Sequence, residues 1–127
     1  MPISYSITAD KMLIREVWTG DISISDLQQY WDQYLQDPGV LAIRRTLVDL
    51  RQASIQFNGN DLSNLVKTMV IPKLQGRSWI SALLVGQPVQ YGVSRQYQVF
   101  AELFSRDAIF DDEKKAEAWL REQVHKT

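Results

Sequence analysis

The chain has 127 residues, of which 45% are hydrophobic and 23% charged, and its formal net charge is −1. This length favours a single domain over residues 1–127, with a core that needs no disulfide or metal. The near-neutral charge excludes the basic surface of a nucleic-acid-binding protein, and the absence of cysteine excludes disulfides, thiol redox chemistry and cysteine-ligated metals.

The N-terminal stretch MPISYSITADK lacks the basic and apolar segments of a signal peptide. Apolar runs such as residues 82–85 are far shorter than a membrane span. The lack of cysteine agrees with a reducing compartment. We therefore expect a cytoplasmic protein that does not insert stably into membranes.

The first part of the chain predicts an antiparallel hairpin. Residues 3–8 alternate apolar and polar, as in a half-buried strand. A second strand is expected over residues 11–19, with Gly20 and Asp21 ending it. Strands this close in sequence should pair with each other.

A helix is expected to follow the hairpin. Ser23 has the properties of an N-cap, and Asp26 stands three positions later as in a capping box. The sequence DPG at 37–39 ends this helix, because proline cannot continue it. Its large apolar side chains recur at helical spacing: Leu27, Tyr30, Trp31, Tyr34 and Leu35.

Strands and helices alternate in the remainder of the chain. Strands are expected at 45–50, 79–85 and 108–110. The loop 51–60 leads to a second helix that Pro72 ends or kinks. The apolar positions of the last three helices are Leu62, Leu65, Val66, Met69 and Val70, then Val93, Tyr97, Phe100 and Phe104, then Ala116, Trp119, Leu120 and Val124.

The predicted order β-β-α-β-α-β-α-β-α defines an α/β fold. It implies a five-stranded, mostly parallel sheet with an N-terminal antiparallel edge hairpin and four helices. If the parallel strands follow sequence order, right-handed crossovers place their helices on one side. The second face then needs cover, from a terminal helix or, as we favour, from a second subunit in a homodimer.

Several segments resemble the small bacterial SpoIIAA-like proteins, which are related in fold to STAS domains and are discussed alongside CRAL-TRIO lipid-transfer domains. The most specific matches are the YG-x-x-R turn and the ending F-x-D-x-x-x-A-x-x-WL. The matching segments are the hairpin, GDISISDL, LVDLR, ALLVGQPVQYGVSRQYQVF and AIFDDEKKAEAWL. The resemblance implies the fold of anti-sigma-antagonist domains, and most members of the group have no established activity.

The chain departs from those domains at the site of regulation. Anti-sigma antagonists carry a phosphorylatable serine at the start of the helix after strand three. The matching turn here is 58–61, NGND, with Ser54 and Ser63 on either side of the expected position. We therefore expect no phosphorylation switch. At 127 residues the chain is also too short for a full lipid-transfer domain.

One candidate ligand site lies where parallel strands end, because ligands of open α/β sheets bind there. It comprises Asp49, Asn58, Tyr91, Gly92 and Arg95. Arg95 in the first turn of a helix opposes the helix dipole, so a bound anion would explain its charge. The structural alternative is an Arg95–Asp49 ion pair, with Gly92 marking close backbone packing.

A second candidate is an apolar groove between helices one and two, lined by Tyr30, Trp31 and Tyr34. Core packing is the alternative for these rings. No catalytic motif, phosphate loop or dinucleotide fingerprint is present, and we assign no metal or catalytic role to His125, the only histidine.

We therefore expect a non-enzymatic regulatory or scaffolding domain that acts through protein–protein contacts, as a homodimer and without a cofactor. Its protein partner is unknown. The alternative function is binding of a small apolar, lipid-like molecule in the groove, or of an anion at the Arg95 edge.

Overall fold

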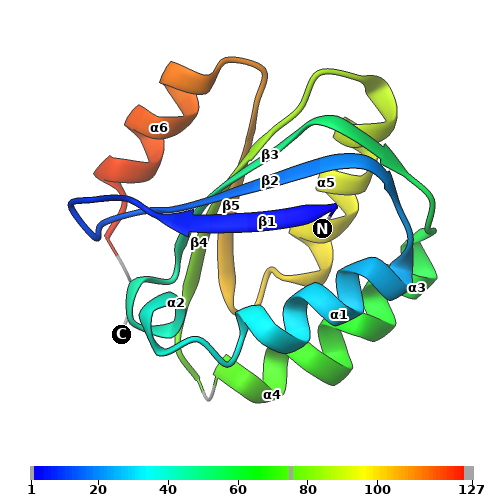
Figure 1. The fold of residues 1–127 in the computed structure, drawn as a ribbon, viewed down its shortest axis with the longest axis horizontal. Helices are drawn as coiled ribbons and strands as arrows, with labels where there is room; N and C mark the ends of the chain where they lie inside the picture. The colour runs from blue at the N-terminus through cyan, green and yellow to red at the C-terminus, as the bar shows by residue number, and fades with distance from the viewer. Residues whose placement is uncertain (1, 75, 125–127) are drawn as a thin grey trace.

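The computed structural model describes residues 2–74 and 76–124, so His125 lies outside the described residues (Figure 1). The elements are β1 (Ile3–Ile7), β2 (Ile14–Ile22), α1 (Ile24–Tyr34), α2 (Pro38–Ile43), β3 (Arg45–Ile55), α3 (Gly59–Leu65), the π-helical turn η1 (Val66–Val70), α4 (Ile71–Leu74), β4 (Trp79–Leu84), α5 (Pro88–Phe100), β5 (Ser105–Phe110) and α6 (Glu113–Glu122). The predicted alternation of strands and helices is confirmed, with α2 as an additional short helix.

The five strands form one sheet in the order β1-β2-β3-β4-β5. Strand β1 pairs with β2 antiparallel, and every later neighbour pair is parallel. The predicted mostly parallel sheet with an antiparallel edge hairpin is confirmed. Sequence order of the parallel strands places three crossovers, which contain α1, α3 and α5, on the same side.

Three strands have other bounds than predicted: β2 is shifted toward the C-terminus at the same length, and β3 and β5 are longer. Strand β2 continues through Gly20 to Ile22, and β3 continues to Ile55, which is the register partner of Ile22. The register shifts between Val17 and Thr19, and Gly20 adopts a φ of +73° that glycine tolerates. Pairing between the two strands supplies hydrogen bonds to residues whose local preferences favour a turn. The predicted strand end at Gly20 and the predicted loop from residue 51 are therefore wrong.

The sequence DPG begins a helix that was not predicted. Helix α1 ends at Tyr34, before the predicted stop at DPG, and Asp37 caps α2. The Asp37 carboxylate accepts a hydrogen bond from the Gly39 amide at 2.8 Å. Pro38 occupies the first turn of α2, where proline has no hydrogen bond to lose.

Pro72 does not end the second predicted helix. The chain widens into the π-helical turn η1 and then continues through Pro72 as α4. Proline lacks an amide hydrogen and crowds the carbonyl four residues before it. The π-helical turn lies just before it, where a helix must accommodate that crowding.

Each face of the sheet carries its own hydrophobic cluster. Helices α1, α3 and α5 cover the larger cluster, and α6 lies on the opposite face (Figure 1). The smaller cluster consists of Leu13, Leu47, Ile80, Ala82, Ala116 and Leu120, with Phe110 and Trp119 packed against it. Val124, predicted to be buried in this helix, is exposed because α6 ends at Glu122.

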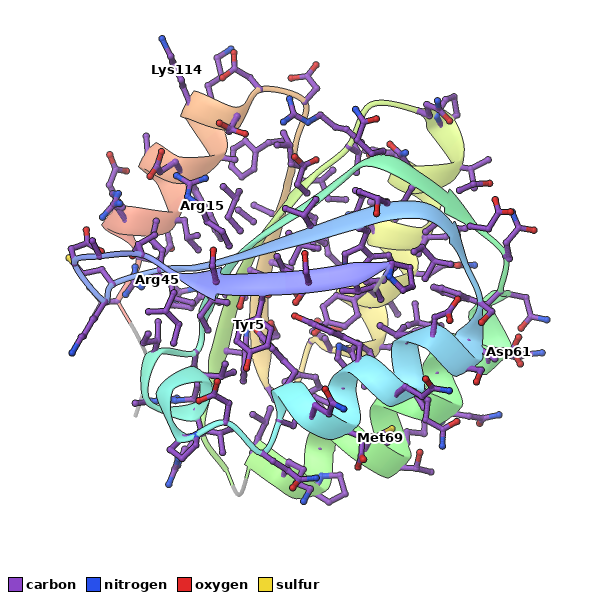
Figure 2. All side chains as sticks on the ribbon, in the orientation of Figure 1. Tyr5, Arg15, Arg45, Asp61, Met69 and Lys114 are labelled. Atoms are coloured by element: carbon purple, nitrogen blue, oxygen red, sulfur yellow. The ribbon has the colours of Figure 1, made fainter. Side chains whose placement is uncertain are left out.

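Polar contacts flank the packing of α6 on the sheet. Arg15 of β2 forms an ion pair with Glu117 at 2.8 Å, and Arg45 of β3 donates a hydrogen bond to the Leu120 carbonyl (Figure 2). The terminal helix α6 thus covers the part of the second face that β3, β4 and β5 form. The need to cover this face was the reason for expecting a second subunit. The homodimer stays a prediction, which light scattering at low micromolar concentration tests.

Candidate functional site

The predicted strand-end site is not assembled as expected, because Asp49 pairs with Arg51. The Arg51 guanidinium donates to both Asp49 carboxylate oxygens, at 3.0 and 2.9 Å, and also contacts Glu113 of α6 at 3.1 Å. These hydrogen bonds lower the pKa of Asp49 although its partial burial opposes the shift. Arg95 instead donates to Gln98 at 2.8 Å. The predicted Arg95–Asp49 ion pair is wrong.

The alternation of side chains along β3 explains this separation. Leu47 belongs to the cluster under α6, whereas Val48 and Leu50 belong to the cluster on the other face. Asp49 therefore points to the α6 side. Arg95 belongs to α5, which packs on the opposite face through Val93, Tyr97 and Phe100.

The other three residues of the predicted site are Asn58, which caps α3, and Tyr91 and Gly92, which lie in α5. Asn58 accepts a hydrogen bond from the Asp61 amide at 2.9 Å. Tyr91 is exposed, and a Cβ placed on Gly92 would meet nothing within 4 Å. Gly92 therefore does not mark close backbone packing, because its surroundings are open. The prediction that Arg95 lies in the first turn of its helix is wrong, because α5 already begins at Pro88. A ligand at this edge stays a prediction.

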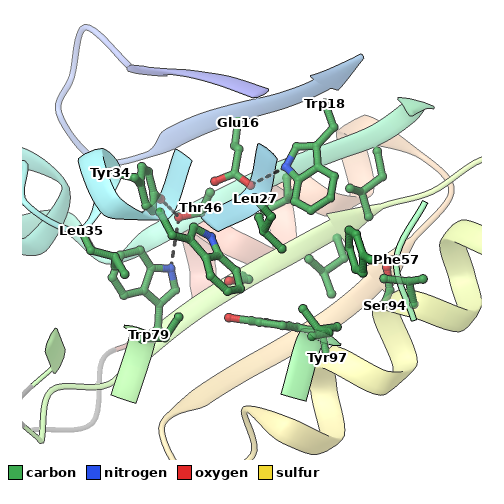
Figure 3. A pocket seen from close by; sticks show the side chains of 18 residues that line it. Glu16, Trp18, Leu27, Tyr34, Leu35, Thr46, Phe57, Trp79, Ser94 and Tyr97 are labelled. Carbon is green, nitrogen blue, oxygen red and sulfur yellow. Dashed lines mark hydrogen bonds between the residues drawn. The ribbon is translucent and has the colours of Figure 1, made fainter. Parts of the chain in front are cut away.

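The interior holds a different candidate site, a cavity between the sheet and helices α1, α3 and α5 (Figure 3). Its volume, taken as the space in which the centre of a water-sized sphere fits, is about 70 Å³. Its walls are mostly aliphatic and aromatic. The lining residues are Glu16, Trp18, Leu27, Trp31, Tyr34, Leu35, Thr46, Val48, Leu50, Phe57, Leu62, Val70, Trp79, Ser81, Leu83, Val93, Ser94 and Tyr97.

Two of the three predicted groove residues lie on this wall. Trp31 and Tyr34 line the cavity. Tyr30 lies beside it and donates a hydrogen bond to Glu16 at 2.8 Å. Helical spacing in α1 directs all three rings toward the sheet, where they are buried.

Glu16 is a carboxylate inside this core, and only 4% of its surface is exposed. The Trp18 indole donates to one carboxylate oxygen at 2.7 Å, and Tyr30 donates to the other. Burial raises the pKa of Glu16 to about 7, although both hydrogen bonds oppose the shift. In the described residues, Glu16 has no cationic partner.

Thr46 organises the polar edges of two further rings. The Tyr34 hydroxyl lies 2.8 Å from the Thr46 hydroxyl, and the Trp79 indole donates to that hydroxyl at 3.1 Å (Figure 3). The ring centroids of Tyr34 and Trp79 are 5.9 Å apart. Thr46 therefore satisfies the polar atoms of both rings and leaves their aromatic surfaces to line the cavity.

Ser94 and Tyr97 bring hydroxyl groups from α5 to the cavity wall. Ser94 is 2% exposed, and its hydroxyl is the buried side-chain oxygen that has no hydrogen-bond partner among the described residues. Burial raises the pKa of Tyr97, so its phenol is neutral. Nearby on β5, burial raises the pKa of Asp107 to about 7.

The described part of the chain offers no group of three or more histidine, aspartate or glutamate side chains placed to bind a metal. Within the same residues, no helix is long and apolar enough to cross a bilayer.

Sequence reasoning missed Glu16, Thr46, Ser94 and Tyr97 as candidate site residues. The signal for Glu16 was present, because Ile14, Glu16 and Trp18 share one face of an alternating strand. A carboxylate between two inward-facing apolar residues indicates a buried charge. Ser94 carried no comparable signal, since serine is common on helix surfaces.

The strand order, the edge hairpin and the placement of α6 define an α/β protein with the SpoIIAA-like fold. Similar solved structures include an uncharacterised DUF3478-family protein from Shewanella loihica PV-4, which has a SpoIIAA-like fold. It is 17% identical over 93% of this chain and 91% of its own, with a TM-score of 0.61. The unphosphorylated anti-sigma factor antagonist SpoIIAA is 12% identical over 95% and 99%, with a TM-score of 0.58. No family model and no curated protein matches the sequence.

Proposed function

We propose that this protein binds a small, mainly apolar molecule in the cavity between the sheet and helices α1, α3 and α5. The observation that carries the proposal is the space itself, about 70 Å³ for the centres of water-sized molecules. Protein cores rarely contain voids larger than a water molecule, and about 10–15 Å³ by this measure holds one water. The cavity is therefore larger than an ordinary packing defect.

The composition of the walls supports the same proposal. Small-molecule sites are mostly apolar and contain a few placed polar groups that orient the ligand. Here the apolar surface comes from leucine, valine and aromatic side chains, and Glu16, Ser94 and Tyr97 supply the polar groups. Leaving a buried hydroxyl unpaired costs about 1–3 kcal/mol. A ligand that bonds to Ser94 recovers part of this cost.

Binding of a small apolar molecule is the alternative function expected from the sequence, but its place differs: the cavity lies between the sheet and the helices, not in a groove between two helices. The regulatory role through protein contacts stays a separate prediction, since no described feature identifies a partner surface. The proposal concerns binding, and it assigns no chemical step to the cavity.

Native mass spectrometry of the protein purified from its own host tests the proposal. We expect a small molecule that stays bound to the native protein and is released on denaturation. The cavity-filling variant Ser94→Leu should lose this molecule, because the leucine side chain takes its space. The control Arg95→Leu places the same residue at the next, exposed position of α5, where it takes no cavity space, and should retain the molecule.

Two outcomes would contradict the proposal. The first is native protein that carries no molecule and whose Tm does not change with small apolar probes such as indole. The second is a Ser94→Leu variant that folds and retains the molecule as the wild type does.

A further inference from the structure

We propose that the molecule in this cavity is a small organic cation, an alkylammonium whose positive charge lies beside Glu16. This inference rests on the proposed binding function and names the chemical class of its ligand. Three features of the described residues carry it: a buried carboxylate without a counter-charge among them, a wall of aromatic rings, and a hydroxyl without a partner among them.

Two hydrogen-bond donors hold the Glu16 carboxylate in place. Trp18 and Tyr30 each donate a hydrogen bond to a different oxygen of Glu16, at 2.7 and 2.8 Å. Both donors favour the negative form. Among the described residues, no lysine or arginine lines the cavity. Buried charges in proteins are normally paired, so a cation in the cavity would complete the site.

The aromatic wall suits the same ligand. Rings from five elements or loops line the cavity: Trp18, Trp31, Tyr34, Phe57, Trp79 and Tyr97 (Figure 3). The hydrogen-bonding atoms of Trp18, Tyr34 and Trp79 are already paired with Glu16 or Thr46. These rings therefore offer the cavity their π surfaces, which attract cations within about 6 Å of the ring centroid and form the cages that bind quaternary ammonium groups.

The hydroxyl of Ser94 adds a neutral polar group to the wall. It is buried and has no partner among the described residues. It suits a hydroxyl or another neutral hydrogen-bonding group on the ligand. Choline combines a quaternary ammonium with a hydroxyl, so it is the probe that we choose.

Ionisation of Glu16 gives the binding a pH dependence. The titratable groups around Glu16 and the cavity are Tyr5 of β1, Tyr30 and Tyr34 of α1, Tyr97 of α5 and Asp107 of β5. Burial raises the pKa of every one of the four phenols, so all stay neutral near pH 7. A bound cation holds Glu16 ionised, and choline affinity should therefore rise as the pH increases toward 7 and then level off.

The main test compares choline with its uncharged isostere 3,3-dimethylbutan-1-ol by isothermal titration calorimetry on the wild-type protein. The two probes have nearly the same shape and the same hydroxyl. We expect choline to bind at least about tenfold more tightly, because only its charge interacts with Glu16 and the rings. This comparison needs no variant and so does not depend on a substitution that must fold.

Variants then assign the charge preference to one carboxylate. Glu16→Gln should weaken choline binding at least about tenfold, remove its pH dependence and leave binding of the neutral isostere unchanged. Asp107→Asn is the matched control, since Asp107 has a similarly raised pKa but does not line the cavity. It should retain the wild-type preference for choline.

The outcomes separate this inference from the proposed function. Equal binding of the two probes, or full choline affinity in Glu16→Gln, overturns the cation inference while a cavity ligand stands. If neither probe binds but native mass spectrometry finds a retained neutral molecule, the cation inference alone fails. If neither probe binds and no molecule is retained, both fail.

Discussion

Glu16 holds a carboxylate in the main core, paired with the Trp18 indole and the Tyr30 hydroxyl. In the folded protein its pKa is about 7, against an ordinary value of 4.5. Between these two pH values the folded protein keeps a proton that the unfolded chain has released. The contribution of Glu16 to stability therefore falls as the pH rises through this window and stays low above it.

We expect Glu16→Gln to flatten the dependence of the unfolding free energy on pH between 5 and 8. The amide retains an acceptor for Trp18 and carries no charge to bury. The wild type should lose about 2.5 kcal/mol more than the variant across this window. Urea unfolding at several pH values measures the difference.

Asp107→Asn is the comparison variant. The pKa of Asp107 is also raised, so its contribution to stability also falls as the pH rises. Carboxylates with lowered pKa values, such as Asp26 and Asp37, lose their contribution only below about pH 4. A Glu16→Gln profile as steep as that of the wild type would show that Glu16 has an ordinary pKa in the folded protein.

Ser94 has a buried hydroxyl without a partner. Ser94→Ala should stabilise the ligand-free protein by about 1 kcal/mol, because it removes the unpaired group and improves helix propensity in α5. Thermal unfolding of ligand-free protein measures this change. A destabilisation of similar size would mean that the hydroxyl is bonded in solution.

At the scale of elements, the local signals for helices were reliable. The capping box of Ser23 and Asp26 is confirmed, with both reciprocal hydrogen bonds at 3.1 and 2.9 Å. The apolar spacing in α1 identified the buried face, including Trp31 and Tyr34. Strand ends were less predictable, because Gly20 and the residues after position 50 prefer turns and are held in strands by pairing between β2 and β3.

Substitution by alanine should change the stability of the protein in opposite directions at two glycines, Gly92 in α5 and Gly20 in β2. Gly92 lies inside α5 with open space around its Cα, so Gly92→Ala should stabilise by about 0.5–1 kcal/mol. Gly20 also has open space but a φ of +73°, so Gly20→Ala should destabilise by about 1 kcal/mol through backbone strain. Chemical denaturation of both variants measures the pair. Effects of the same sign would contradict these conformations.

For the molecule as a whole, α6 supplies the cover that the second sheet face requires. Its Ala116 and Leu120 pack against Leu13, Leu47 and Ile80. The predicted need for cover was correct, and the structure meets it within one chain.

Leu120→Ala tests this role of α6. The side chain is fully buried, so the substitution should cost about 2–5 kcal/mol of unfolding free energy. Leu103→Ala is the matched control, because Leu103 is 97% exposed and its loss should change stability by less than about 0.5 kcal/mol. Guanidinium unfolding compares the two. A small effect of Leu120→Ala would show that α6 is not packed on the sheet in solution.

The sequence by itself determined the order of strands and helices, the edge hairpin and the aromatic face of α1, since these depend on spacing and caps within short segments. Only the tertiary structure decided that Asp49 and Arg95 lie on opposite faces, that Glu16 is buried, and that a cavity remains between sheet and helices. Each of these depends on how elements distant in sequence pack together, and pairing energy between strands overrides the turn preference of individual residues.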